Sequence, residues 1–270
     1  MIFLNRQVLL ACILLSLFAL FALLAPLFSP YTGVEVHLLD KNKPPSWQFL
    51  LGTDELGRDL CTRVALGIRI SLFIGLIASL IDLIVGVFFA TLSVFFSKRW
   101  RSFLLQTMDI LYAIPHLLLV ILLSTSMGPG YLSLLIALTM TGWIRMARIL
   151  RSHFLDVKER AFVQASLAMG ANKRHILWVH LLPNSQGPLL VTLTLTISST
   201  IFAEAFLSFL GLGIQAPYAS LGTMTSEALS ALPSYPWRLF VPGGSIILIL
   251  LAFSMLSDAL RDIFSLGYAE

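Results

Sequence analysis

Long apolar runs alternate with short polar segments along this chain. Six such runs are present, at residues 8–28, 70–96, 103–126, 131–150, 187–212 and 239–257. A helix rises about 1.5 Å per residue, so a run of about 20 residues crosses the roughly 30 Å hydrocarbon core of a bilayer. The pattern therefore predicts an all-α, polytopic membrane protein with six transmembrane helices.

Composition supports the same class. Apolar residues make up 57% of the 270 positions and charged residues 12%, with a mean hydropathy of +0.88. A soluble domain has about 45–50% apolar and about 25% charged residues. The net charge of +4 would suggest nucleic acid in a soluble protein, but in a membrane protein Lys and Arg mainly record topology. We therefore expect membrane lipid as a partner and no nucleic acid.

The first apolar run, within residues 1–29, is predicted to be an N-terminal transmembrane helix. A cleaved signal peptide is the alternative, because Arg6 precedes the run and small residues such as Ala22 and Ala25 lie near its end. The apolar region of a signal peptide is only about 7–15 residues long, so a retained span is favoured. Residues 70–270 then form a core of five further spans.

Residues 30–69 form a polar, proline-containing segment that is predicted to lie outside the membrane. Within residues 51–64, apolar side chains recur at i, i+4 and i+8, namely Leu56, Leu60 and Val64. This spacing predicts an amphipathic helix at the membrane interface. Arg58 and Asp59 would form the solvated face of that helix.

The distribution of positive charge predicts the orientation. If the N-terminus is cytoplasmic, twelve of the 18 Lys and Arg residues fall on the cytoplasmic side, Arg145 and Arg148 among them, and six fall on the other. Cytoplasmic segments carry the excess of Lys and Arg. Both termini and residues 151–186 are therefore expected in the cytoplasm, and residues 30–69 and 215–238 outside.

Residues 162–184 form a polar and basic island between two apolar runs, F-V-Q-A-S-L-A-M-G-A-N-K-R-H-I-L-W-V-H-L-L-P-N. Gly170 suits the left-handed position at the end of a first helix. Asn172 suits the N-cap of a second short helix over residues 175–181, which Pro183 would end. Two short helices joined by a tight turn would form a rigid cytoplasmic element. The alternative is an amphipathic loop on the lipid headgroups.

Few polar side chains lie within the predicted spans. Asp82 is the acid nearest the middle of one, and buried ionisable groups in a membrane are functional candidates because their burial is costly. Pro115 predicts a kink, and His116 beside it is either a pathway residue or a packed side chain. We take Asp82, Pro115 and His116 as candidates for a translocation path. Asp109 and Glu204 lie nearer the ends of their spans.

Sequence motifs of catalysis are absent from the chain. It has no G-x-x-x-x-G-K-[S/T], H-E-x-x-H, C-x-x-C or G-x-S-x-G motif. Cys12 and Cys61 lie in different segments and suggest neither a disulfide framework nor a metal site. We expect no enzyme activity, no metal and no cofactor. If ATP drives transport, a separate subunit must bind and hydrolyse it.

The 162–184 segment resembles the E-A-A-x-x-x-G-x(9)-I-x-L-P signature of the membrane subunits of ABC importers. The matching residues, in order, are Gln164, Ala165, Ser166, Gly170, His180, Leu182 and Pro183. The spacing of the signature is kept throughout. Three residues depart from it, because Gln164 replaces Glu, Ser166 replaces Ala and His180 replaces Ile.

Further motifs resemble the second membrane subunit of dipeptide, oligopeptide and nickel permeases. They occur in family order over nearly the whole chain: L-G-T-D-E-L-G-R-D at 51–59, M-D-I-L-Y-A-I-P at 108–115, A-R-I-L-R at 147–151, V-K-E-R at 157–160 and L-S-F-L-G-L-G-I-Q-A-P at 207–217. The resemblance implies the type I ABC importer permease fold. It also implies ATP-driven import of dipeptides or oligopeptides by alternating access.

The resemblance implies partners and a location as well. Members of this family work in the bacterial cytoplasmic membrane with a homologous permease subunit, two ATP-binding subunits and an extracytoplasmic substrate-binding protein. The signature segment would dock on the ATPase, where Lys173 and Arg174 would meet acidic groups or, alternatively, lipid headgroups. Gln164 would hydrogen-bond there without the charge of the family's Glu.

Two alternatives stay open from the sequence. Relatives with the same motifs carry nickel or other metal complexes, or antimicrobial peptides. From another class, a secondary transporter would work without an ATPase, but it would need a charge network at mid-depth, where only Asp82 is found.

Overall fold

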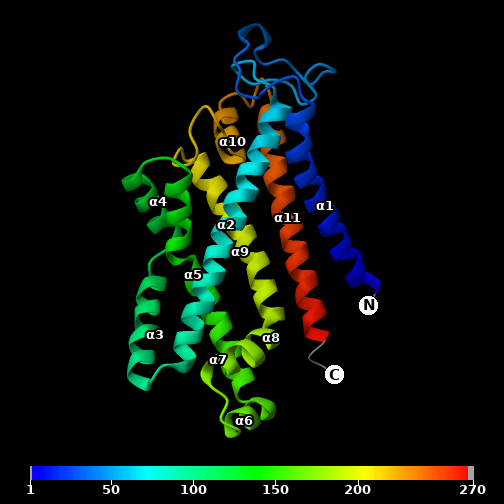
Figure 1. Ribbon diagram of the computed structural model, residues 1–270. Helices are drawn as coiled ribbons and strands as arrows, with labels where there is room; N and C mark the ends of the chain where they lie inside the picture. Colours follow the sequence, from blue (N-terminus) through cyan, green and yellow to red (C-terminus); the bar gives the residue numbers. More distant parts are fainter. Residues whose placement is uncertain (1, 267–270) are drawn as a thin grey trace.

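Five long helices form most of the bundle in this protein. The computed structural model describes residues 2–266 (Figure 1). The long helices are α1 (Ile2–Phe28), α2 (Leu60–Phe95), α5 (Tyr131–Lys158), α9 (Gln186–Phe209) and α11 (Trp237–Leu266). Each contains a stretch that is long and apolar enough to span a membrane, and the described residues contain no β-strand. The predicted class, an all-α polytopic membrane protein, is confirmed.

A sixth span is present only as a broken helix. The single span predicted over residues 103–126 is divided into α3 (Lys98–Ala113) and α4 (His116–Met127), which are bent by 79°. The break lies at Ile114 and Pro115. Proline has no N–H to donate and disfavours the helical conformation of the residue before it, so Ile114 is extended, with φ −74° and ψ 126°.

The connecting segments gather at the two ends of the bundle (Figure 1). One end, called the loop end below, carries residues 29–59, with the short 3-10 helix η1 (Leu38–Asp40), and α10 (Leu221–Leu229). The opposite end, called the segment end, carries four short helical pieces: α6 (Ala161–Ala168), α7 (Lys173–His175), the π-helical η2 (Ile176–Leu181) and α8 (Leu182–Asn184). The start of α1 and the end of α11 both point toward the segment end (Figure 1).

The predicted interfacial helix within residues 51–64 is not formed. Residues 51–59 make turns instead, and Gly57 adopts a positive φ of +74°. A Cβ at Gly57 would collide with the carbonyl of His37, so the close approach of these two loop segments requires glycine there. The spacing of apolar residues was misread because the last of them belong to α2, a helix that begins inside the predicted loop.

The start of α2 is determined by a cap. The carboxylate of Asp59 accepts a hydrogen bond from the backbone N–H of Thr62 at 2.9 Å, so the helix begins at Leu60 rather than near residue 70. Leu60 and Val64, two of the residues assigned to the interfacial helix, are 2% and 1% exposed within the bundle. At about 1.5 Å per residue, α2 is roughly 54 Å long, so it extends beyond the hydrocarbon core.

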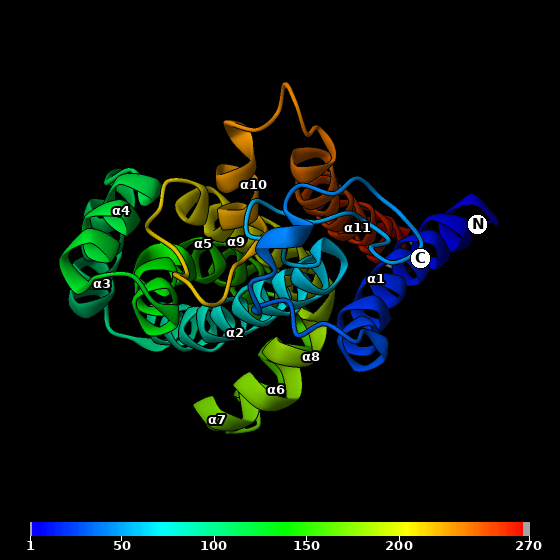
Figure 2. The same ribbon diagram turned by 90° about the horizontal axis from the view of Figure 1, so that it is seen from above.

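Close packing of α2 against α5 and α9 forms the centre of the bundle. Viewed from above, α3 and α4 lie on one side of these helices and α1 lies on the other (Figure 2). Gly75 of α2 lies against Ile201 of α9, and Gly86 lies against Met146 of α5. Small residues let helices approach closely in a membrane, where van der Waals contact rather than burial from water drives association.

The first helix is fastened to the bundle by an unusual polar contact. Pro26 in α1 has no N–H, which leaves the carbonyl of Ala22, four residues earlier, without its helical donor. The guanidinium of Arg69 in α2 donates to that carbonyl at 2.8 Å. The contact satisfies a backbone acceptor that lipid tails cannot satisfy.

Candidate functional site

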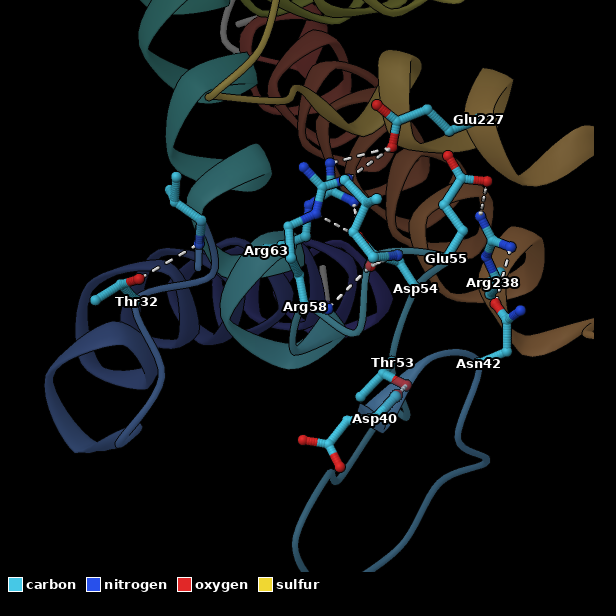
Figure 3. Close-up of polar contacts among 12 residues, drawn as sticks. Thr32, Asp40, Asn42, Thr53, Asp54, Glu55, Arg58, Arg63, Glu227 and Arg238 are labelled. Atoms are coloured by element: carbon cyan, nitrogen blue, oxygen red, sulfur yellow. Dashed lines mark hydrogen bonds and ion pairs between the residues drawn. The ribbon is translucent and has the colours of Figure 1, made fainter. Parts of the chain in front are cut away.

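A network of charged side chains connects the 51–59 loop to the bundle at the loop end (Figure 3). At its centre lies Asp54, which is 2% exposed. Its Oδ1 accepts hydrogen bonds from the backbone N–H groups of Leu56 and Arg58 at 2.8 and 2.9 Å. Its Oδ2 accepts from Nε of Arg58 at 2.6 Å and from the guanidinium of Arg63. Because Arg63 lies near the start of α2, this carboxylate fixes the loop to that helix.

The network continues onto α10 and α11 (Figure 3). Glu227 of α10 accepts a hydrogen bond from Arg63 at 3.1 Å. Arg238 of α11 donates to Glu55 at 3.3 Å and to Asn42 at 3.1 Å. The loop is therefore held to α2 and α10 by one group of paired charges around Asp54, and to α11 by a second group of polar contacts around Arg238.

Burial and pairing together determine the charge of Asp54. Burial alone would raise the pKa of the Asp54 carboxyl, but the charges of Arg63 and Arg58 and the backbone N–H of Arg58 hold the pKa below its usual value. Arg58 and Asp59, which were predicted on a solvated face, are only 7% and 5% exposed. That prediction was wrong because their charges are satisfied within the loop and at the start of α2.

A cleft of about 310 Å³ opens among α2, α5 and α9 at the break between α3 and α4, both of which also contribute to its lining. All three residues predicted for a translocation path, Asp82, Pro115 and His116, line it. They come from separate parts of the chain and are brought together by the fold. Pro115 creates the break, and His116 begins α4 directly after it.

Asp82 reaches into the cleft from α2. It is 2% exposed, and its carboxylate lies against Gly142 of α5, where an added Cβ would collide with it. Its Oδ1 has no hydrogen-bond partner among the residues that the structure describes. The backbone N–H of Trp143 donates a hydrogen bond to the Asp82 carboxylate. The charge of Arg145 acts on both Asp82 and His116. Nδ1 of His116 lies 2.8 Å from the hydroxyl of Thr141, which joins α4 to α5 across the cleft.

Sequence reasoning found the acid of the cleft but missed its surroundings. Arg145 was only counted among the charges on the cytoplasmic side, and its place midway along α5, on the cleft lining, was not foreseen. Its spacing from Thr141, at i and i+4 within an apolar run, is a signal that could have identified a polar face. Thr196, Ser199 and Thr200 give the same signal on α9 and also line the cleft.

The other two acids of the predicted spans lie outside the cleft lining. Glu204 is fully buried and accepts hydrogen bonds from the hydroxyls of Ser71 and Ser208 at 2.7 and 2.8 Å. Asp109 of α3 pairs with Arg148 of α5 at 2.5 Å. Arg148, which the charge count placed on the cytoplasmic side, therefore joins α5 to α3 through a partly exposed ion pair.

The 162–184 segment begins as two helical pieces joined by a tight turn. Gly170 follows α6 with a left-handed φ of +87°. The side chain of Asn172 then accepts a hydrogen bond from the backbone N–H of His175 at 2.7 Å and caps α7. The turn and the cap therefore lie where the sequence predicts them.

Pro183 does not end the second helix. The helical backbone continues through η2 and α8 to Asn184, so this part of the prediction was wrong. In the π-helical η2 the N–H of Leu182 bonds to the carbonyl of Leu177, five residues earlier. That wider turn tolerates a proline, which has no N–H for the next bond. His180 lies in this turn, with its ring 5.7 Å from that of Phe162 in α6.

One face of the segment is buried and the other is open. Three buried side chains pack against the ends of α2 and α5, namely Val163, Ile176 and Leu181, and Ser166 is buried as well. Ala165 and Pro183 are exposed, and Leu182 is half-buried. Met169 and Trp178 are 82% and 69% exposed, which leaves large apolar groups uncovered on the open face. An open hollow of about 380 Å³ lies beside Ser166, Gly170 and Asn172.

The polar residues of the segment make few contacts with the bundle. The amide of Gln164 donates to the carbonyl of Lys158 at 2.7 Å. Nζ of Lys173 donates to the carbonyl of Phe95 at the end of α2, at 3.3 Å. Arg174 is exposed. The signature residues thus lie together at the segment end, away from the three cleft residues.

Comparison with known sequences assigns most of the chain to one family. Residues 82–268 match the family described as binding-protein-dependent transport system inner membrane component. Over 258 residues, 96% of this chain and 85% of the relative, the chain is 45% identical to the oligopeptide transport system permease protein OppC of Bacillus subtilis (strain 168). Over 251 residues, 93% and 78%, it is 46% identical to the dipeptide transport system permease protein DppC of the same organism.

Comparison with solved structures gives the fold. A chain of the MetNI methionine ABC transporter in an inward-facing conformation has a TM-score of 0.61 at 15% identity, covering 73% of this chain and 94% of that one. A chain of an amino acid ABC transporter, determined with histidines, has a TM-score of 0.59 at 16% identity, covering 74% and 92%. The helices are therefore arranged as in type I ABC importer permeases, as the sequence resemblance implies.

Proposed function

Because this chain belongs to the family of binding-protein-dependent transport system inner membrane components, and is a permease subunit of an ABC importer rather than an enzyme, we propose that it carries dipeptides or oligopeptides. One observation carries this proposal. The chain is 45% and 46% identical, over more than nine-tenths of its length, to permeases named for oligopeptide and dipeptide transport. ATP would be bound and hydrolysed only by separate subunits.

The proposal includes the surroundings of the subunit. It would lie in the bacterial cytoplasmic membrane beside a homologous permease subunit, with two ATP-binding subunits at the segment end and a substrate-binding protein at the loop end. Both termini would be cytoplasmic. The excess of Lys and Arg in segments on the same side as the N-terminus supports this orientation.

We infer that the 162–184 segment docks on the ATPase. Exposed apolar side chains beside positive charge are typical of a protein contact, and here Met169 and Trp178 lie near Lys173 and Arg174. Gln164 can still accept a hydrogen bond through its carbonyl oxygen while its amide is held by Lys158. Packing and neutral hydrogen bonds would therefore contribute more to this contact than an ion pair.

Movement of the docked segment would reach the cleft through two helices. The segment follows α5 and leads through α8 into α9. Both helices line the cleft, α5 with Thr141 and Arg145 and α9 with Ser199 and Thr200. Rigid helices that connect a docking surface to a pathway are the usual means by which ATP binding drives alternating access.

Removal of the segment tests its role. Deleting residues 165–173 should leave a membrane-inserted protein that no longer supports substrate-stimulated ATP hydrolysis in reconstituted vesicles. A finer pair of variants compares one change at the two ends of the molecule: Trp178→Asp should reduce copurification of the ATPase, and Leu39→Asp, at a loop-end side chain that is 97% exposed, should not. Substrate-stimulated hydrolysis that survives the deletion would exclude the docking role.

Orientation has a separate test. A reporter active only in the cytoplasm should be active when fused after Arg174 and inactive when fused after Asp54. The opposite result would reverse the proposed topology while leaving family membership intact.

A further inference from the structure

The mouth of the cleft carries exposed polar side chains at membrane depth. Pro115, Arg145 and Ser199, from three different elements, line it and are exposed on this subunit. Arg145 lies midway along α5, in the stretch that spans the membrane. A guanidinium at that depth is unfavourable against lipid tails, so such residues face other protein or a water-filled space. In the proposed importer the cleft would therefore open onto the partner permease subunit or a water-filled space.

The floor of the cleft carries an acceptor without a donor. Oδ1 of Asp82 has no partner among the described residues, although the side chain is 2% exposed. The backbone N–H of Trp143 and the charge of Arg145 act on this carboxylate. Its Oδ1 is still buried without a donor from the described part of the chain, which is costly, and a cation that enters the cleft supplies that donor. The hydroxyl oxygens of Ser199 and Thr200 lie on the same lining and accept hydrogen bonds as well.

We propose that this cleft binds the α-ammonium group of a peptide during its passage, with Asp82 as the charged acceptor. The inference rests on the proposed function, because it concerns the cargo named there. An ammonium group has three donors, which suits one carboxylate and two hydroxyls. Arg145 at the mouth carries the opposite charge, so a bound peptide lies with its ammonium inward and its carboxylate outward.

Other cations fit the lining less well. A metal ion prefers several carboxylate, imidazole or thiolate ligands, and no group of three or more such side chains that could hold one occurs among the described residues. Nδ1 of His116 is already committed to Thr141 at 2.8 Å. Of the residues that the structure describes, Asp82 is then the one negatively charged side chain on the cleft lining, and its single charge matches the single positive charge of an ammonium group.

The first test measures uptake by the complete importer in proteoliposomes. The subunit is wild type or carries Asp82→Asn, the binding protein is saturated, and the cargo is a tripeptide or its N-acetylated form. Loss of a hydrogen bond to a charged group should slow uptake of the free tripeptide about tenfold or more. The N-acetylated peptide should be carried poorly by both proteins. The matched control is Asp258→Asn in α11. The carboxylate of Asp258 is exposed and makes only a long ion pair with Arg261, at 3.9 Å, so this variant should transport normally.

The second test examines the cleft without any peptide. In a subunit whose two native cysteines are replaced by Ser, Ser199→Cys is labelled with a cationic or an anionic methanethiosulfonate of similar size. The ratio of cationic to anionic labelling rates reports the local potential. It should fall at least about threefold when Asp82→Asn is added, and it should not change with Asp258→Asn.

The two tests separate the possible failures. Free-peptide uptake and a labelling ratio that both stay within twofold of wild type in Asp82→Asn would overturn the cleft proposal. If the wild-type importer takes up no peptide but the labelling ratio falls, the peptide assignment is wrong and the cation-binding cleft stands. Equal slowing of free and N-acetylated peptides would also overturn the proposal, because the ammonium group would then not be the part recognised.

Discussion

Asp54→Asn is expected to loosen the loop end by removing one negative charge. The Asn carbonyl oxygen can keep the two backbone hydrogen bonds that Oδ1 accepts, at 2.8 and 2.9 Å. Its amide then replaces Oδ2 and faces two guanidinium groups, those of Arg58 and Arg63, which are 7% and 4% exposed. Only the half-exposed Glu227 remains to balance them. Breaking a buried ion pair from one side costs about 3–5 kcal/mol of unfolding free energy.

Thermal unfolding of the purified subunit in detergent measures this effect. A loss of about 3–5 kcal/mol corresponds to a fall in Tm on the order of 10 °C for a chain of this size. Trypsin should also cut faster in the 29–59 loop, at the exposed Lys41. The matched control is Asp40→Asn, which makes the same chemical change in an ion pair with Lys43 whose side chains are 24% and 45% exposed. A solvated pair contributes only about 0–1 kcal/mol, so its Tm should fall by at most a few degrees.

The same pair gives a pH dependence with a definite sign. The pKa of Asp54 is lower in the folded protein than the usual value of 3.8. Its contribution is therefore fully present above that value and is lost as pH falls through the folded pKa. The Tm difference between wild type and Asp54→Asn should be constant from about pH 5 to 8 and should shrink below about pH 4. An Asp54→Asn protein with the Tm and trypsin sensitivity of Asp40→Asn would refute the argument.

Three further changes test other parts of the structure. Arg69→Leu should lower the unfolding free energy by about 1 kcal/mol or more. The loss should be smaller in a Pro26→Ala background, where residue 26 has an N–H for the carbonyl of Ala22, and additive effects in this double-mutant cycle of thermal unfolding would contradict the contact. Gly142→Ala places a methyl group against the carboxylate of Asp82 and should slow uptake at least tenfold in an importer that still assembles, whereas normal uptake would show that this contact is not needed. Asn172→Ala removes a cap of about 1 kcal/mol and should weaken substrate-stimulated ATP hydrolysis, which Asn172→Asp should largely retain; equal losses would argue against the cap.

Features that depend on nearby residues could be predicted from the sequence. Apolar runs of sufficient length identified every long helix, and the left-handed Gly170 and the Asn172 cap were placed correctly within the 162–184 segment. These features follow from hydrophobicity, backbone freedom and hydrogen bonds within a few residues. The start of α2 was misplaced because its determinant, Asp59, is a short-range cap hidden among charges that resemble a solvated helix face.

Features that depend on distant partners could not be predicted. Asp82 was identified as an acid in a span, but the positions of Gly142 and Arg145 beside it require the packing of α2 against α5. The counting of Arg145 on the cytoplasmic side shows the same limit, since a charge count treats each Arg only as a marker of topology. Pro183 was expected to stop a helix because the π-helical register of η2, set by its packing, is not visible in the sequence.

The arrangement of contacts indicates which parts of the cleft move together. At the segment end, Ile176 and Leu181 share one packed cluster with Leu150 and Phe154 of α5 and with Val94 of α2. The segment is also continuous in sequence with α9, so three walls of the cleft respond to its displacement. The remaining wall is formed at the break between α3 and α4, with Leu111 and Tyr112 of α3 before it and His116 of α4 after it, where the two helices are bent by 79°. Displacement of the segment should thus change the cleft by shifting α2, α5 and α9 relative to the break between α3 and α4.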